Sequence, residues 1–145
     1  MKKFYLDTCI WLNLFKKEGN ETKGKPYWEI AKEFIENIIF SKEKEIFYSG
    51  FVLKELMFIL EEEKFKEKIH FLRSDEKFIF VKAINEDYLL ARKIESESGY
   101  RISFYDCLHI AVCKRLNFVL VTRDQELINF AKKYISAEKP ESLMS

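Results

Sequence analysis

The sequence predicts an α/β fold built on a parallel sheet. Short apolar runs, each too short for a helix, alternate with longer stretches in which apolar residues recur every three or four positions. Hairpin turn sequences do not join successive runs, so the intervening helices are expected to carry the chain between parallel strands. The predicted strands span residues 3–6, 46–49, 78–81 and 118–122.

Residues 103–124 form the stretch around which the rest of the chain is organised. Ser103 and Asp106 fit the Ser-x-x-acid pattern of a helix start, and residues 118–122 form a β-branched and apolar run typical of a buried strand. Only Asn117 separates the two elements clearly, so the helix is expected to start near the level where the strand ends. Asp106 and Asp124 are therefore predicted to meet in space.

The other elements follow from apolar periodicity and from residues typical of helix ends. Residues 18–25 are polar, contain two of the four glycines and are expected to form a mobile loop. Gly99 is placed to close a helix that Asn85 opens, and the tail around Pro140 is weakly specified. The predicted helices span residues 8–17, 26–38, 51–62, 65–72, 85–99 and 124–134.

Composition places the chain among globular proteins. Its 145 residues are enough for one domain, expected over 1–145, with a sizeable core. Lys and Arg total 25 against 24 for Asp and Glu, so any binding to nucleic acid must use a local patch rather than a global basic field. The start MKKFYLD is too short an apolar run for a signal peptide, and no apolar run approaches the ~20 residues of a membrane span.

The three cysteines show no metal-binding spacing. They are Cys9, Cys107 and Cys113, an odd number without a CxxC pair. We interpret them as reduced thiols of the core, which is typical of a cytosolic protein. The expected location is therefore the cytoplasm.

Four acidic residues are predicted to gather at the carboxyl ends of the strands, where ligands bind in parallel sheets. Asp7 follows the first strand and Asp124 follows the last, while Glu55 lies early in the helix after the second strand. Asp106 is expected at the same edge because only a short turn separates its helix from the last strand. This placement requires the helix over residues 85–99 to run obliquely, so that the helix at Ser103 starts at this edge. Glu55 interrupts an apolar stripe, and an acid there costs free energy unless something pairs with it.

Each of these acids also has a purely structural interpretation. Asp7 and Asp124 fit helix N-caps, where Asp is favoured by about 1 kcal/mol. Asp106 fits the reciprocal partner in a capping box, and Glu55 fits a rim ion pair with a lysine such as Lys54. The coincidence of all four at one edge favours a functional site.

Clustered carboxylates without an obvious basic partner are typical ligands of hard cations such as Mg²⁺ or Mn²⁺. One or two such ions can activate water and stabilise charge on a phosphodiester. His109 lies one turn after Asp106, and Cys113 lies a further turn along, so a mixed zinc site is an alternative. Because that ligand set is incomplete, we expect His109 to support the acids or to pack beside them.

Other polar side chains adjoin the acidic edge. Thr8 and Thr122 are placed to hydrogen-bond the neighbouring acids, although helix entry and β-propensity explain them equally well. Most of the cations near this edge are expected to be solvated, while some contact a phosphate backbone. These cations are Lys16, Lys17, Lys23, Lys25, Lys54, Arg101 and Arg123, of which Arg123, Lys54 and Arg101 are the candidate RNA contacts.

The ordered acids resemble those of the PIN-domain nucleases, particularly the VapC-type toxins of prokaryotic toxin–antitoxin pairs. The resemblance rests on YLDT at Asp7, LKEL at Glu55, YDCLHIA at Asp106 and VTRD at Asp124. It implies a three-layer α/β/α sandwich with a short, mainly parallel sheet and a Mg²⁺- or Mn²⁺-dependent endoribonuclease, usually a homodimer. It also implies a small antitoxin protein that inserts near the acidic pocket, and it makes the four acids the catalytic metal site.

The match has departures, and other functions are open. Cys9 stands where many relatives have a polar residue, and Met57 and Phe58 replace an Arg/Gly-containing helix end. The same edge would also suit a non-catalytic PIN-like module that binds RNA or protein. A phosphotransfer domain would need a second acid where Tyr5 stands, and the scattered glycines form no nucleotide-binding loop.

Overall fold

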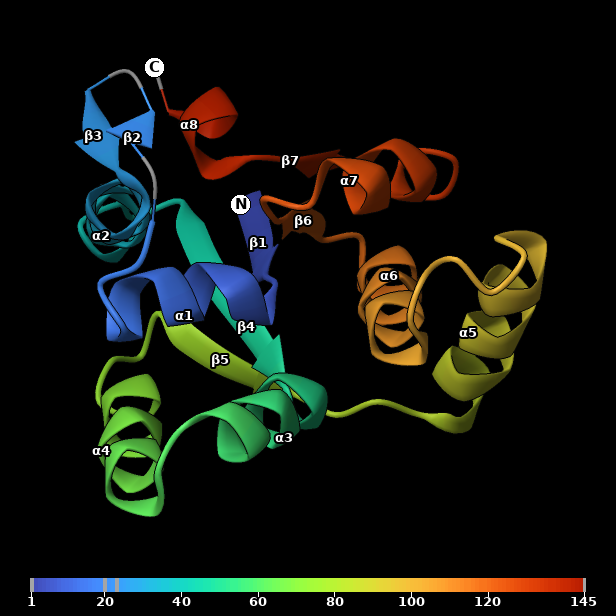
Figure 1. Cartoon of the computed structure of the whole chain (residues 1–145), viewed down its shortest axis with the longest axis horizontal. Coiled ribbons are helices and arrows are strands. Elements are labelled where there is room, and N and C mark those ends of the chain that lie inside the picture. The colour runs from blue at the N-terminus through green and yellow to red at the C-terminus, as the bar shows by residue number, and fades with distance from the viewer. Residues whose placement is uncertain (1, 20, 23, 145) are drawn as a thin grey trace.

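A five-stranded parallel sheet forms the centre of the computed structural model, which describes residues 2–19, 21–22 and 24–144. The strand order is β5-β4-β1-β6-β7, and every neighbouring pair runs parallel (Figure 1). All five carboxyl ends therefore lie at one edge. The strands are β1 (Lys2–Leu6), β4 (Lys44–Ser49), β5 (Phe78–Val81), β6 (Val119–Val121) and β7 (Ala137–Glu138).

Helices cover both faces of the sheet, which confirms the predicted α/β/α sandwich. Neighbouring residues of β1 point to opposite faces, and each meets a different helix: the ring of Phe4 lies 5.4 Å from that of Phe34, and Tyr5 lies 5.3 Å from His109. The helices are α1 (Thr8–Phe15), α2 (Tyr27–Ile39), α3 (Gly50–Ile59), α4 (Glu62–Leu72), α5 (Asn85–Glu97), α6 (Phe104–Leu116), α7 (Gln125–Ala131) and α8 (Pro140–Leu143).

The turn between α6 and β6 is as short as predicted. Asn117 ends α6 in the left-handed conformation, with φ 58° and ψ 47°, which Asn tolerates better than most residues. The backbone N–H of Phe118 then donates to the carbonyl of Cys113, which closes the helix. Because β6 leads away at once, the first turn of α6 lies at the carboxyl edge of the sheet, as the position of Asp106 requires.

Three expectations for the elements are corrected. Residues 18–25 are predicted to form a loop, but Glu21–Thr22 (β2) pairs with Lys25–Pro26 (β3) in a short antiparallel ladder. The helix expected over 51–62 ends at Ile59, because Leu60 is extended and a new helix starts with acids in its first turn, where the helix dipole favours them. Ile84 rather than Asn85 occupies the N-cap of α5.

The weakly specified tail adds a strand to the sheet. Residues Ala137 and Glu138 form β7 and pair in parallel with β6. Two residues carry no detectable alternation, so periodicity could not predict this strand. Within the described residues, no helix has the length and apolar character needed to cross a membrane.

Candidate metal centre

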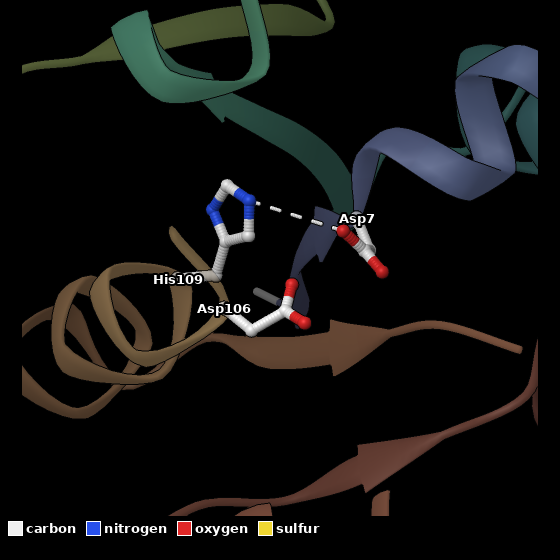
Figure 2. A group of neighbouring side chains, drawn as sticks. All are labelled: Asp7, Asp106 and His109. Atoms are coloured by element: carbon white, nitrogen blue, oxygen red, sulfur yellow. Dashed lines mark ion pairs between the residues drawn. The ribbon is translucent and has the colours of Figure 1, made fainter. Parts of the chain in front are cut away.

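Asp7, Asp106 and His109 converge at the carboxyl end of β1, the central strand of the sheet (Figure 2). Asp7 directly follows β1, while Asp106 and His109 lie one turn apart on α6. Each residue offers a ligand atom, and these atoms all lie within 4.8 Å of one another. Asp7 and Asp106, two of the four acids expected at this edge, thus lie together, whereas Asp124, the acid predicted to meet Asp106, is not in this group of described residues.

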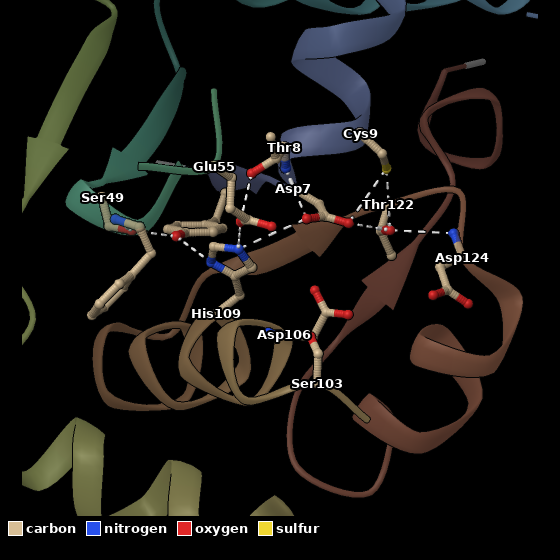
Figure 3. A network of polar contacts seen from close by, with 12 residues as sticks. Asp7, Thr8, Cys9, Ser49, Glu55, Ser103, Asp106, His109, Thr122 and Asp124 are labelled. Carbon is tan, nitrogen blue, oxygen red and sulfur yellow. Dashed lines mark hydrogen bonds and ion pairs between the residues drawn. The ribbon is translucent and has the colours of Figure 1, made fainter. Parts of the chain in front are cut away.

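Asp7 is buried and its carboxylate is held from three sides. One oxygen accepts the backbone N–H of Thr8 at 2.8 Å and so caps α1. The other accepts the hydroxyl of Thr122 at 2.8 Å and the thiol of Cys9 at 3.3 Å (Figure 3). Burial raises the pKa of the Cys9 thiol, which keeps it a donor. The orientation of Asp7 is therefore fixed by its neighbours.

Asp106 is less constrained and electrostatically unfavourable. Its backbone N–H is capped by the Ser103 hydroxyl at 3.2 Å, but its carboxylate receives no comparable set of hydrogen bonds from the described residues. Burial, followed by the negative charge of Asp7, raises the pKa of Asp106 to about 7, and Glu55 adds to the shift. Two carboxylates held together in this way are stabilised by a cation or by a shared proton.

A chain of hydrogen bonds extends from the neighbourhood of Asp7 through Glu55 and His109 to Ser49 (Figure 3). Glu55 accepts the Thr8 hydroxyl at 2.8 Å and lies 2.9 Å from Nε2 of His109. Nδ1 of His109 lies 2.7 Å from the hydroxyl of Tyr5, which in turn lies 2.6 Å from Oγ of Ser49. Glu55, the acid that interrupts an apolar helix face, is thereby paired.

The contacts between Glu55 and His109 favour the charged form of each side chain. Burial alone would lower the pKa of His109, but the hydrogen bond to Glu55 and the charges of Asp7, Glu55 and Asp106 raise it above its ordinary value. Burial alone would raise the pKa of Glu55, but His109 and the Thr8 hydroxyl lower it. Nε2 of His109 cannot donate to Glu55 and bind a metal ion at once, so this arrangement gives His109 a supporting position.

Asp124 does not join the compact group formed by the described residues. It is exposed and caps α7, with its carboxylate accepting the backbone N–H of Leu127 at 3.2 Å. Its own N–H donates to the hydroxyl of Thr122, the side chain that also donates to Asp7. The N-cap interpretation of Asp124 is thus present in the structure, and one shared threonine connects this residue to the centre.

The three candidate RNA contacts lie in different surroundings. Lys54 is exposed on α3, next to Glu55. Arg101 is exposed and pairs with Glu126 at 3.0 Å.

Arg123 is not the surface cation that was expected. Its side chain is only 11% exposed, pairs with Glu141 at 3.0 Å and stacks 3.9 Å above the ring of Tyr27. Lys23, named with the flanking cations, lies outside the described residues.

Tyr5 and Ser49 also belong to the site, although their sequence context does not predict it. The available signal was the hydroxyl of Tyr5 within a buried strand, since a buried tyrosine hydroxyl usually finds a partner. Its position between His109 and Ser49 could not be read from periodicity, because the three residues come from three elements. The zinc alternative fails for the described residues, where Cys113 is fully buried and lies outside the ligand group.

The side chains present fit a hard divalent cation. Asp7 and Asp106 supply carboxylate oxygens, the ligands that Mg²⁺ and Mn²⁺ prefer. The raised pKa of Asp106 reflects burial and then the negative charge of Asp7, and a bound cation would offset both by neutralising charge at the site. Asp7 and Asp106 are the side chains placed to hold it.

Comparison with solved structures supports the architecture. The chain is similar to VapBC2 from Rickettsia felis bound to a DNA fragment from their promoter, with 17% identity, a TM-score of 0.71 and coverage of 94% of this chain and 98% of that chain. DNA-bound VapBC from Salmonella typhimurium gives 19% identity, a TM-score of 0.67 and coverage of 97% and 99%. VapBC-5 from Mycobacterium tuberculosis, a member of the VapBC family of toxin–antitoxin systems, gives 14% identity and a TM-score of 0.55. The match covers 96% of this chain and 98% of that chain.

Comparison at the level of sequence families is more specific. No match was found among curated proteins. A family model described as PIN domain matches residues 4–133, which include all four acids singled out in the sequence. That match covers most of the chain, and the parallel sheet with its acidic carboxyl edge agrees with it. The chain belongs to the PIN-domain family.

Proposed function

We propose that this protein is a metal-dependent endoribonuclease that cleaves RNA phosphodiester bonds with Mg²⁺ or Mn²⁺ as cofactor. The observation that carries the proposal is the convergence of Asp7 and Asp106, with His109, at the carboxyl end of the central strand. The family match makes nuclease chemistry the natural use of such a centre. Glu55 and Asp124 complete the proposed acidic set.

The chain's own residues prepare this site in distinct ways. Asp7 and Asp106 would hold the cation, which supplies charge stabilisation and water activation when bound. Thr122 and Thr8 orient Asp7 and Glu55 through the hydrogen bonds described above. Asp124 lies at the exposed margin of the site, where its carboxylate would complete the acidic set.

His109 would act through Glu55 and Asp7 rather than on the substrate. Its Nε2 lies 2.9 Å from Glu55 and 3.8 Å from Asp7, so its positive charge offsets part of their negative charge. His109 thereby lowers the pKa of Glu55 and favours its ionised form. An ionised carboxylate attracts a divalent cation more strongly than a protonated one.

The proposed biological context is a toxin–antitoxin pair. The similar solved structures are VapBC complexes, so a small antitoxin protein is the expected partner. A homodimer acting in the cytoplasm completes this proposal. A gene for a small protein with a DNA-binding domain and a flexible tail, lying beside this one, would support it.

The test is cleavage of labelled single-stranded and structured RNAs by the purified chain with Mn²⁺, with Mg²⁺ and with chelator. We expect metal-dependent cleavage, and Asp106→Asn should reduce its rate by about 100-fold or more, because a metal site contributes several kcal/mol of transition-state stabilisation. Asp75→Asn, at the turn before β5, is the matched control and should cleave normally.

Circular dichroism and urea unfolding show whether each variant is folded. A folded Asp106→Asn variant with full activity would remove Asp106 from the proposed mechanism. Binding of RNA that survives chelation, without cleavage of any RNA, would instead support the non-catalytic binding module.

A further inference from the structure

A pocket of about 310 Å³ opens at the carboxyl ends of β4 and β5. Two lysines and three aromatic residues line it, and none of its lining residues is acidic. The residues around it are Gly50, Phe51, Lys54, Phe80, Lys82, Ala83 and Tyr88. Within a chain whose cations and anions are nearly equal in number, such a lining is a local positive patch.

Two of the three aromatic side chains of this pocket are exposed to solvent. Phe80 is 50% exposed and Tyr88 is 43% exposed, whereas most large apolar residues of this protein are buried. Phe51 lies between them and the centre, with its ring 5.7 Å from that of Tyr88. Exposed rings grouped around one pocket are typical of a surface that binds a ligand.

The pocket lies beside the acidic centre. In the sheet order β5-β4-β1, β4 ends at the pocket and is the immediate neighbour of β1, which Asp7 follows (Figure 1). Neighbouring strands lie about 4.8 Å apart. The ring of Phe51 lies 5.9 Å from that of Tyr105, the residue before Asp106. Lys54 directly precedes Glu55 on α3.

We propose that this pocket is a binding track for single-stranded RNA that leads the substrate to the acidic centre. The inference deepens the proposed nuclease function and rests on it. Unpaired bases would stack on Tyr88, Phe80 and Phe51, and Lys54 and Lys82 would hold the phosphates. A duplex offers no free base faces for such stacking, so the surface selects single strands.

Charge explains why RNA rather than a protein segment is the expected occupant. Asp7, Glu55 and Asp106 repel a phosphate backbone, so a substrate needs positive charge close to them. Lys54 and Lys82 supply it on the side of the centre where the aromatic rings lie. A protein partner would not require two lysines without a single acid around the same apolar pocket.

The test measures binding of the full chain to a labelled single-stranded RNA and to its duplex, by fluorescence anisotropy in chelator, which prevents metal-dependent cleavage. Tyr88→Ala should weaken single-strand binding by about 5- to 100-fold, as expected for the loss of one base–aromatic stack. Tyr88→Phe keeps the ring and should bind like the original chain. The double variant Lys54→Gln, Lys82→Gln should lower the salt-dependence slope by about 1.4.

Matched controls come from the opposite edge of the sheet. Phe40, 82% exposed, and Lys42 lie just before β4, so Phe40→Ala and Lys42→Gln should leave binding unchanged. Equal affinity for duplex and single strand, or pocket variants that bind normally, would overturn the proposed track. So would variants that bind RNA normally but lose self-association in sedimentation, since the pocket would then be a protein interface.

Cleavage assays with Mn²⁺ on the same variants separate this inference from the proposed function. Normal cleavage by all pocket variants, together with unchanged binding, would reject the track and leave the nuclease standing. Binding lost in the Tyr88→Ala variant of a chain that cleaves no RNA would reject the nuclease and retain the pocket as a surface for single-stranded RNA.

Discussion

Asp7 and Asp124 show how one residue type serves two purposes in this protein. Both follow the carboxyl end of a strand and both cap the next helix. Asp7 is buried and also accepts the Thr122 hydroxyl, whereas Asp124 is exposed and makes its side-chain hydrogen bond to the backbone of α7. The carboxylate of Asp7 can therefore cap a helix and take part in the proposed metal site at once. At Asp124, substitutions can test helix capping and a contribution to the metal site separately.

Two substitutions at Asp124 separate these purposes. Asp124→Asn retains a good N-cap but removes the charge, so it should leave urea unfolding unchanged and reduce cleavage less than Asp106→Asn does. Asp124→Ala removes both and should also lower the free energy of unfolding by about 0.5–2 kcal/mol. Full activity of Asp124→Asn would leave this residue as a helix cap alone.

At the scale of elements, Arg123 fastens the C-terminal segment to the rest of the molecule. Its guanidinium pairs with Glu141 of α8, stacks on Tyr27 of α2 and donates to Asn13 of α1 at 3.1 Å. Burial alone would raise the pKa of Glu141, but the hydrogen bond and charge of Arg123 lower it. One side chain thus connects three helices.

Removing this connection should cost stability. Arg123→Ala leaves Glu141 largely buried without its partner, so we expect a loss of about 3 kcal/mol in urea unfolding. Arg101→Ala is the control: it breaks an ion pair whose side chains are 72% and 54% exposed and should cost about 0–1 kcal/mol. Equal losses would show that the buried pair has no special contribution.

At the scale of the whole molecule, the parallel sheet places every strand's carboxyl end at one edge and concentrates negative charge there. The central position of β1 brings Asp7 between α6 on one face and the start of α1 on the other. Partial burial and the charge of Asp7 then raise the pKa of Asp106 to about 7. We therefore expect the stability of the fold to depend on pH and on divalent cations.

This coupling predicts a pH dependence of the metal-free chain. Because the pKa of Asp106 is about 7 in the folded state and about 3.9 unfolded, the folded state binds the proton more tightly. The stabilisation from this group is complete below pH ~4 and is lost as pH rises to about 7. Thermal unfolding in chelator should show that Asp106→Asn loses less stability than the original chain between pH 5 and pH 8.

Divalent cations should reverse the effect. Mn²⁺ binds the ionised carboxylates, so it should raise the unfolding temperature of the original chain more at pH 8 than at pH 5. Asp106→Asn should lose most of this response, and Asp75→Asn should keep it. A response to Mn²⁺ that is the same in all three proteins would place the ion elsewhere.

Much of this protein was determined by local sequence. Apolar runs too short for helices defined four of the strands of the central sheet, and a single Asn117 between helix and strand was enough to bring Asp106 to the edge where Asp7 lies. These features depend on neighbours within a few positions, through backbone sterics and alternation, so the sequence determines them by itself.

Tertiary structure decided the rest, because those features depend on residues distant in the chain. The strand β7 exists through its pairing with β6 rather than through its own two residues. Arg123 became internal because Tyr27 and Glu141 pack around it, and Tyr5 reached His109 and Ser49 because three elements meet there. A side chain's exposure and partners are set by packing between elements, and periodicity records only which face of its own element it occupies.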